Sequence, residues 1–218
     1  MTEPRFTGAV FDLDGVIADT ARFHFLAWQR LALEEGFDIP HEVDDRVKGV
    51  DRMASLRIVL EYADRQYSAP EQEALAARKN GYYVDLIASL TPADMLPGAG
   101  EVLRTLRAAG IPIGLASASK NALPVLKALG VLDEFDFVVD AATVTNGKPD
   151  PEIFLKAAVG IGIAPANCVG FEDAPAGVTS IRQAGMYAIG IGNAELLREA
   201  DEVFPTLADV SLARYFKL

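Results

Sequence analysis

Short apolar runs alternate with longer segments of helical periodicity along most of the chain. The runs are Ala9 to Phe11, Ile113 to Ala116, Phe137 to Val139, Cys168 to Phe171, and Ala188 to Ile191. Strands buried on both faces of a parallel sheet have this continuous apolar character. The order strand, helix, strand, helix therefore predicts an α/β fold, a doubly wound parallel sheet with a Rossmann-like core.

The predicted helices have clear start and stop signals. Three of them, over about 99–109, 121–129 and 174–184, are each followed by a glycine, which is the common residue after a helix end. A further helix is expected to begin at Asp150-Pro151-Glu152, where a capping residue precedes a proline in the first turn.

Residues 19–92 have a different pattern. They are rich in Ala, Leu, Glu, Arg and Lys and contain no convincing strand, so several helices are expected there. We predict a discontinuous core domain of residues 1–18 and 93–218, with a small helical cap domain of residues 19–92 inserted after the first strand.

Composition and charge narrow the classes of function. The 218 residues carry a net charge of -11, which argues against sequence-independent binding to nucleic acid. No stretch approaches the about 18 apolar residues of a membrane span, and no secretory signal is visible. The single cysteine, Cys168, fits a reducing compartment. We expect a cytoplasmic, monomeric protein that binds neither nucleic acid nor membrane.

Polar residues follow the predicted strands at the point where each strand ends. Asp12 and Asp14 follow the first strand, Ser117 follows the second, and Glu172-Asp173 follow Phe171. Lys148 precedes a helix. Each of these could be only a cap or turn residue. Because ligands bind beyond the carboxyl ends of parallel strands, their convergence on one edge indicates a functional site.

This mixture of groups suits phosphoryl transfer. An ionised Asp12 needs no base to attack phosphorus, and Asp14 can exchange a proton with the attacking or leaving group. The clustered carboxylates repel a phosphate, so a hard divalent cation such as Mg2+ and the ammonium of Lys148 are expected to offset their charge. The Ser117 hydroxyl and backbone N–H groups at a helix start are expected to hold the phosphate oxygens.

The segment Asp12-Leu-Asp14-Gly-Val resembles the first motif of the haloacid dehalogenase (HAD) superfamily of phosphotransferases. Ser117, Lys148 and Glu172-Asp173 resemble its second, third and fourth motifs in the same order. Within that superfamily, further stretches resemble the β-phosphoglucomutase family. These are 11–20, 48–52, 78–80 and 115–121.

The resemblance implies an activity and a set of core roles. The family interconverts β-glucose 1-phosphate and glucose 6-phosphate with Mg2+, through β-glucose 1,6-bisphosphate as an activating intermediate. Asp12 is expected to be phosphorylated and Asp14 to act as acid and base. Ser117 and Lys148 are expected to contact the transferring phosphoryl group. The metal ligands implied are Asp12, Asp14 (through its carbonyl), Glu172 and Asp173.

The resemblance also assigns residues around the cap. Thr20 is expected at the hinge, with His24 linked to Asp14. The residues expected to contact the phosphosugar are Trp28, Lys48, Gly49, Arg52, Lys79, Ser119, Lys120 and Asn121. Thr20, His24 and Trp28 recur every four residues, so a helix would place them on one face. Each of three cap residues also has a purely structural interpretation. His24 could be a hydrogen-bonded histidine between the two domains, Trp28 a core aromatic residue and Lys79 an exposed lysine.

Two other functions share these motifs. A Mg2+-dependent sugar-phosphate phosphatase would use Asp12 and Lys148 in the same way but release phosphate to water. A non-catalytic phosphosugar-binding module would bind without turnover. A mutase needs a site for the second phosphate and a cap whose closure excludes water. Arg52, Ser119 and Asn121 are the expected second-phosphate site.

Overall fold

The computed structural model describes residues 6–218, which form a doubly wound parallel sheet. Its strand order is β3-β2-β1-β4-β5-β6, and every neighbouring pair is parallel. The strands are β1 (Gly8–Phe11), β2 (Ile113–Leu115), β3 (Phe137–Val138), β4 (Cys168–Glu172), β5 (Tyr187–Ile191) and β6 (Glu202–Phe204). The predicted fold class, a Rossmann-like α/β sheet, is confirmed.

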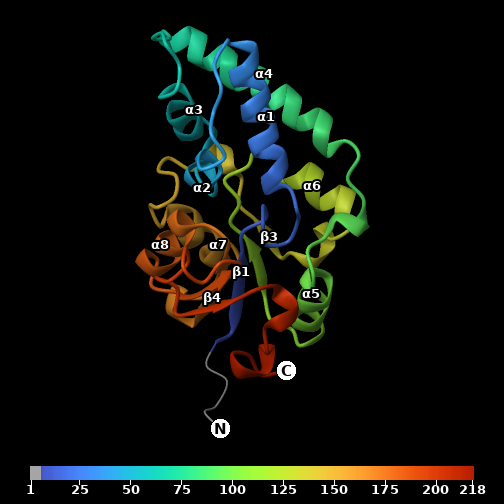
Figure 1. Ribbon diagram of the computed structural model, residues 1–218. Coiled ribbons are helices and arrows are strands. Elements are labelled where there is room, and N and C mark those ends of the chain that lie inside the picture. Colours follow the sequence, from blue (N-terminus) through green and yellow to red (C-terminus); the bar gives the residue numbers. More distant parts are fainter. Residues whose placement is uncertain (1–5) are drawn as a thin grey trace.

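The helices form two groups along the chain. Among the described residues, five lie between β1 and β2: α1 (Ala21–Glu34), α2 (Val43–Val47), α3 (Arg52–Leu60), α4 (Ala69–Ile87) and α5 (Ala99–Ala108). Three follow β2: α6 (Ala122–Leu129), α7 (Glu152–Gly160) and α8 (Pro175–Gln183). Figure 1 shows α1 to α4 together at one end of the molecule, with the C-terminal end at the other. Among the described residues, no helix has the length and apolarity to cross a bilayer.

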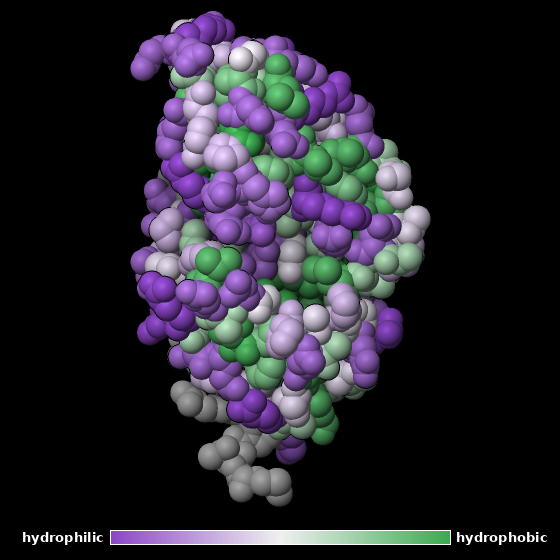
Figure 2. Space-filling view, viewed as in Figure 1, coloured by the Kyte–Doolittle hydropathy of each residue, from purple (hydrophilic) through white to green (hydrophobic). Residues whose placement is uncertain are grey.

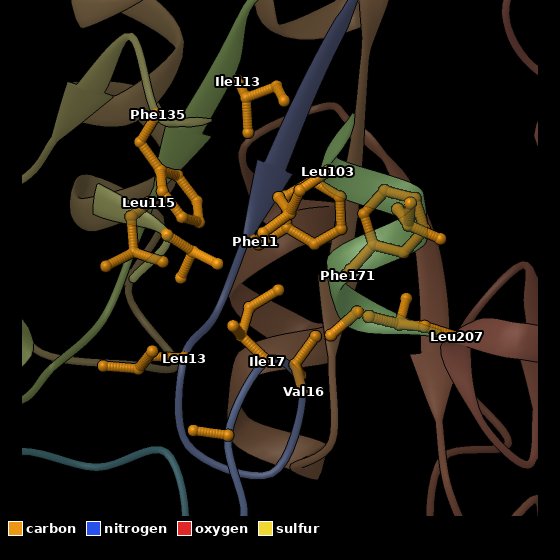
Figure 3. Close-up of a cluster of buried hydrophobic side chains, with 14 of the residues drawn as sticks. Phe11, Leu13, Val16, Ile17, Leu103, Ile113, Leu115, Phe135, Phe171 and Leu207 are labelled. Carbon is orange, nitrogen blue, oxygen red and sulfur yellow. The ribbon is translucent and has the colours of Figure 1, made fainter. Parts of the chain in front are cut away.

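The sheet is buried on both faces. Ala9 and Phe11 belong to an apolar cluster with residues of α5 and α6, whereas Val10 belongs to a second cluster with α7 and α8. This alternation follows from the period of two in a strand. The rings of Phe11 and Phe171 stack with centroids 4.4 Å apart, at the centre of the first cluster (Figure 3). This stacking fixes the end of β1 relative to the end of β4.

Helices α1 to α4 share an apolar cluster of their own, which includes Trp28, Leu31, Leu56 and Val59. The helices α1 and α4 also contact the sheet's first cluster through Ala27, Tyr83 and Ile87. The face of the molecule in Figure 2 mixes hydrophilic and hydrophobic residues. The boundaries of the cap, at residues 19 and 92, stay a prediction.

The structure differs from the sequence-based expectation in two local details. β6 was not predicted; it has only three residues, all partly exposed, at the sheet edge. Helix α7 begins at Glu152, so Pro151 lies just before the helix instead of in its first turn. Asp150 still caps this end, because its Oδ1 accepts a hydrogen bond from the N–H of Glu152 at 2.9 Å.

Candidate active site

The ends of β1 and β4 lie side by side at the point where the strand order diverges. Phe11 pairs with Phe171, and the N–H of Asp12 donates to the carbonyl of Phe171 at 3.0 Å. The chain leaves β1 for α1 and β2 on one side, while β4 continues to β5 on the other. Such a switch point opens a crevice for ligands at the carboxyl ends of the strands. Asp12 and Glu172 both stand at this crevice.

Lys148 joins these two carboxylates. Its ammonium donates to Asp12 Oδ1 at 2.8 Å and to Glu172 Oε2 at 2.7 Å, and all three side chains are buried. Burial, followed by the charge of Glu172, raises the pKa of Asp12 to about 8, although Lys148 opposes this. Burial alone would lower the pKa of Lys148, but the two carboxylates hold it above its usual value.

Asp14 is held by donors from three directions. Asp14 Oδ1 accepts from Thr20 Oγ1 at 2.6 Å and from the Tyr83 hydroxyl at 3.3 Å, and it lies 3.5 Å from His24 Nε2. Burial raises the pKa of Asp14, but His24 and the hydroxyl groups more than offset that effect and bring it to about 2. In this arrangement Asp14 is ionised.

The turn after Asp14 explains the glycine that follows it. Gly15 has φ +83°, in the left-handed region that glycine favours. A Cβ at this position would lie 2.0 Å from Asp173 Oδ2. Glycine therefore lets the loop after β1 approach the carboxylate that follows β4.

Asp12, Glu172 and Asp173 form a group that fits a hard cation. One carboxylate oxygen from each lies within 4.8 Å of the others. Burial and the charges of Glu172 and Asp12 raise the pKa of Asp173, which indicates an excess of negative charge that a divalent cation would neutralise. Oxygen donors are the ligands that Mg2+ prefers. Both oxygens of Glu172 already accept hydrogen bonds, from Lys148 and from the N–H groups of Asp173 and Ala174.

A buried lysine completes the cluster around Asp14. Lys79 Nζ lies 2.8 Å from His24 Nδ1 and 4.5 Å from the ring centroid of Trp28. A protonated lysine can only donate, so His24 Nε2 then carries the ring proton and faces Asp14. Lys79 is 2% exposed, which excludes the simple surface interpretation of this residue. His24 also stacks on Tyr83, with ring centroids 3.8 Å apart.

A cavity of about 560 Å³ brings residues that follow the strands together with residues of α1 to α4. Eleven of the predicted site residues line it: Asp12, Asp14, His24, Trp28, Lys48, Gly49, Arg52, Lys79, Ser119, Lys120 and Lys148. Four more hydrogen-bond to lining residues: Thr20, Ser117, Asn121 and Glu172. Asp173 belongs to the acidic group with Asp12. The structure therefore gathers the predicted residues around one cavity, and their roles stay proposals.

Several contacts of the site residues were not predicted. Tyr83 bonds to Asp14, and Asn80 bonds to Arg52 and Asn121. Tyr83 follows Lys79 by four residues in α4, so helical spacing could have indicated it. The ion pair of Lys48 with Asp44, at 3.2 Å, was foreseeable from the same spacing in α2.

Comparisons with known proteins agree with this geometry. The model of the haloacid dehalogenase-like hydrolase family matches residues 6–185. A β-phosphoglucomutase from Bacillus subtilis is 45% identical, covering 93% of this chain and 91% of that protein. The crystal structure of a β-phosphoglucomutase from Clostridium difficile has a TM-score of 0.91 and 44% identity, covering 94% of this chain and 93% of the other. Hexitol phosphatase A from Escherichia coli is 32% identical, covering 96% and 95%.

The chain belongs to the haloacid dehalogenase-like hydrolase family. Within that family it groups, by sequence and by fold, with enzymes that are phosphomutases and therefore isomerases. The predicted resemblance is confirmed.

Proposed function

We propose that this enzyme is a β-phosphoglucomutase, which interconverts β-glucose 1-phosphate and glucose 6-phosphate. The intermediate is β-glucose 1,6-bisphosphate, and Asp12 carries the phosphoryl group between sugars. The supporting observation is that one cavity is lined both by Asp12, Asp14 and Lys148 and by a second basic group from the cap, Arg52. A bisphosphate needs a site at each of its two phosphates.

The first half of the proposed reaction starts from the phosphorylated Asp12. The 6-hydroxyl oxygen of β-glucose 1-phosphate attacks phosphorus, and the bond between phosphorus and the Asp12 oxygen breaks. Asp14 takes the hydroxyl proton, and its pKa of about 2 means that the carboxylate is ionised before this step. The products are the bisphosphate, an ionised Asp12 and a protonated Asp14.

In the second half, the bisphosphate has reoriented in the closed cavity so that its C1 phosphate faces Asp12, and Asp12 and Asp14 exchange roles as acceptor and donor. An Asp12 oxygen attacks the phosphorus at C1, and Asp14 returns its proton to the departing C1 oxygen. Glucose 6-phosphate leaves and Asp12 is phosphorylated again, so atoms and protons balance. Lys148 stabilises the transferring group by its positive charge, and Ser117 is proposed to donate to a phosphate oxygen.

Asp12, Asp173 and the carbonyl of Asp14 are the residues that would hold Mg2+, with Glu172 positioning Lys148 against them. When bound, Mg2+ supplies charge neutralisation between the carboxylates and the phosphate. It would also favour the ionised form of Asp12, whose pKa is raised to about 8 without it.

A second candidate function is a sugar-phosphate phosphatase. The 32% identity to hexitol phosphatase A favours it, since the core residues serve either reaction. The two activities differ only in whether a sugar hydroxyl or water accepts the phosphoryl group of Asp12.

The test follows β-glucose 1-phosphate with Mg2+ and a trace of β-glucose 1,6-bisphosphate, with glucose 6-phosphate and free phosphate measured in parallel. We expect rapid formation of glucose 6-phosphate with little free phosphate, and no turnover by the Asp12→Ala variant. Mainly free phosphate would identify a phosphatase that uses the same nucleophile. Binding without Mg2+-dependent turnover would indicate a phosphosugar-binding module.

A further inference from the structure

The side-chain oxygen of Asn80 joins two parts of the molecule. Asn80 Oδ1 accepts a hydrogen bond from Arg52 Nη2 at 2.7 Å and another from Asn121 Nδ2 at 2.9 Å. Arg52 begins α3, Asn80 lies in α4, and Asn121 directly precedes α6 beside the sheet. One atom therefore connects three elements that are far apart in the sequence.

The chemistry of these partners fixes the orientation of the Asn80 amide. A guanidinium group has no acceptor, so the group that faces Arg52 must be the oxygen. The guanidinium is planar, and a hydrogen bond to one of its nitrogens sets the direction of the remaining N–H groups. Since Arg52 lines the cavity, those groups can meet an anion there without first losing rotational freedom.

A neutral acceptor suits this position better than a carboxylate. An aspartate at position 80 would pair with Arg52 as an ion and compete with a phosphate for it. An amide oxygen orients the guanidinium and leaves its charge for the ligand. The hydrogen bond to Asn80 Oδ1 orients the side-chain amide of Asn121 as well. The backbone N–H of Asn121 also donates to Ser119 Oγ at 3.3 Å.

We propose that Asn80 is a positioning residue for the phosphate that does not react. It holds Arg52 of the cap and Asn121 of the core in one arrangement, so the second-phosphate site is complete only when cap and core meet. This inference rests on the proposed function, because it assumes a substrate that presents a phosphate away from Asp12.

The test compares a sugar phosphate with a phosphoryl donor that has no sugar. Asn80→Leu removes the acceptor at similar size, and Asn80→Asp keeps it but adds a charge. We expect both variants to raise KM for β-glucose 1-phosphate about tenfold, with a smaller change in kcat. Hydrolysis of acetyl phosphate, which lacks a second anchoring group, should stay within about twofold of the wild type. Gly81→Ala, at an exposed neighbour in α4, is the matched control and should leave both reactions unchanged.

A double-mutant cycle tests whether Asn80 acts through Arg52. In an Arg52→Ala background, Asn80→Leu should raise KM by much less than it does in the wild type. An unchanged KM in Asn80→Leu, an equal loss with both substrates, or full additivity with Arg52→Ala would overturn the proposal. If the wild type releases phosphate and forms no glucose 6-phosphate, the proposed function fails. The comparison of the two substrates still decides the role of Asn80.

Discussion

At the scale of single residues, the buried amine of Lys79 is expected to destabilise the fold although it contacts His24 beside the site. Burial, followed by the charge of Arg52, lowers the pKa of Lys79 from 10.5 to about 7. In the unfolded chain the amine keeps its proton up to about pH 10. Between these values the unfolded state binds more protons at this amine, so the unfavourable contribution of Lys79 to the free energy of folding should shrink as the pH rises from 7 to 10.

We expect Lys79→Met, which keeps the length of the side chain, to raise the melting temperature by a few degrees at pH 6. The gain should shrink by pH 9.5, where the wild-type lysine is neutral in the folded state. Thermal unfolding of both proteins at the two pH values measures this, with exposed Lys127→Met as the control. A gain of the same size at both pH values would contradict the explanation. The variant should lose mutase activity, because Lys79 contacts His24.

At the scale of elements, helix α8 holds the fourth motif in place. Gly177 in α8 is buried, and a Cβ there would lie 1.9 Å from Glu172 Oε2, the oxygen that binds Lys148. Glycine therefore allows α8 to pack directly on the end of β4. The position of Lys148 beside Asp12 depends on this close packing.

We expect Gly177→Ala to destabilise the fold by about 1–3 kcal/mol through overpacking, and to reduce phosphoryl transfer by displacing Glu172. Gly81→Ala is the comparison, because Gly81 is exposed in α4 with no atom within 4 Å of an added Cβ. It should stabilise the protein by about 1 kcal/mol through helix propensity. Urea unfolding gives both free energies. Equal effects of the two substitutions would disprove the packing argument.

Elements with a strong local pattern could be predicted from the sequence. The strands at the centre of the sheet are buried on both faces and have continuous apolar runs, so their order along the chain was clear. β6 has a partly exposed Glu-Val-Phe segment with no such signal. The bridge from Asn80 to Arg52 depends on how α3 packs against α4, and no spacing within either helix indicates it.

At the scale of the whole molecule, the acidic group at the strand ends opposes folding when no cation is bound. Asp12, with its pKa raised to about 8, and Asp173, with its pKa also raised, both bind protons more tightly in the folded state. The contribution of these two carboxyl groups to the stability of the metal-free protein should therefore fall as the pH rises from about 4 to 8. A cation bound to the ionised group would reverse this loss.

We expect Mg2+ to raise the melting temperature relative to EDTA, and to raise it more at pH 8 than at pH 5.5. The larger effect at pH 8 follows because the carboxylates must be ionised to bind the cation. Differential scanning fluorimetry measures the four conditions. Asp173→Asn is the control and should lose most of the shift. A shift that is independent of pH would show that Mg2+ acts elsewhere on the protein.

The separate apolar cluster of α1 to α4 has a consequence for how such enzymes diversify. Substitutions within that cluster can reshape one wall of the cavity, which Trp28 lines, while β1 and β4 keep their stacked phenylalanines and carboxylates in register. Selection can thus change substrate specificity without changing the residues that break the phosphate bond. A new substrate specificity can therefore evolve through substitutions in α1 to α4, while the residues at the ends of β1 and β4 stay the same.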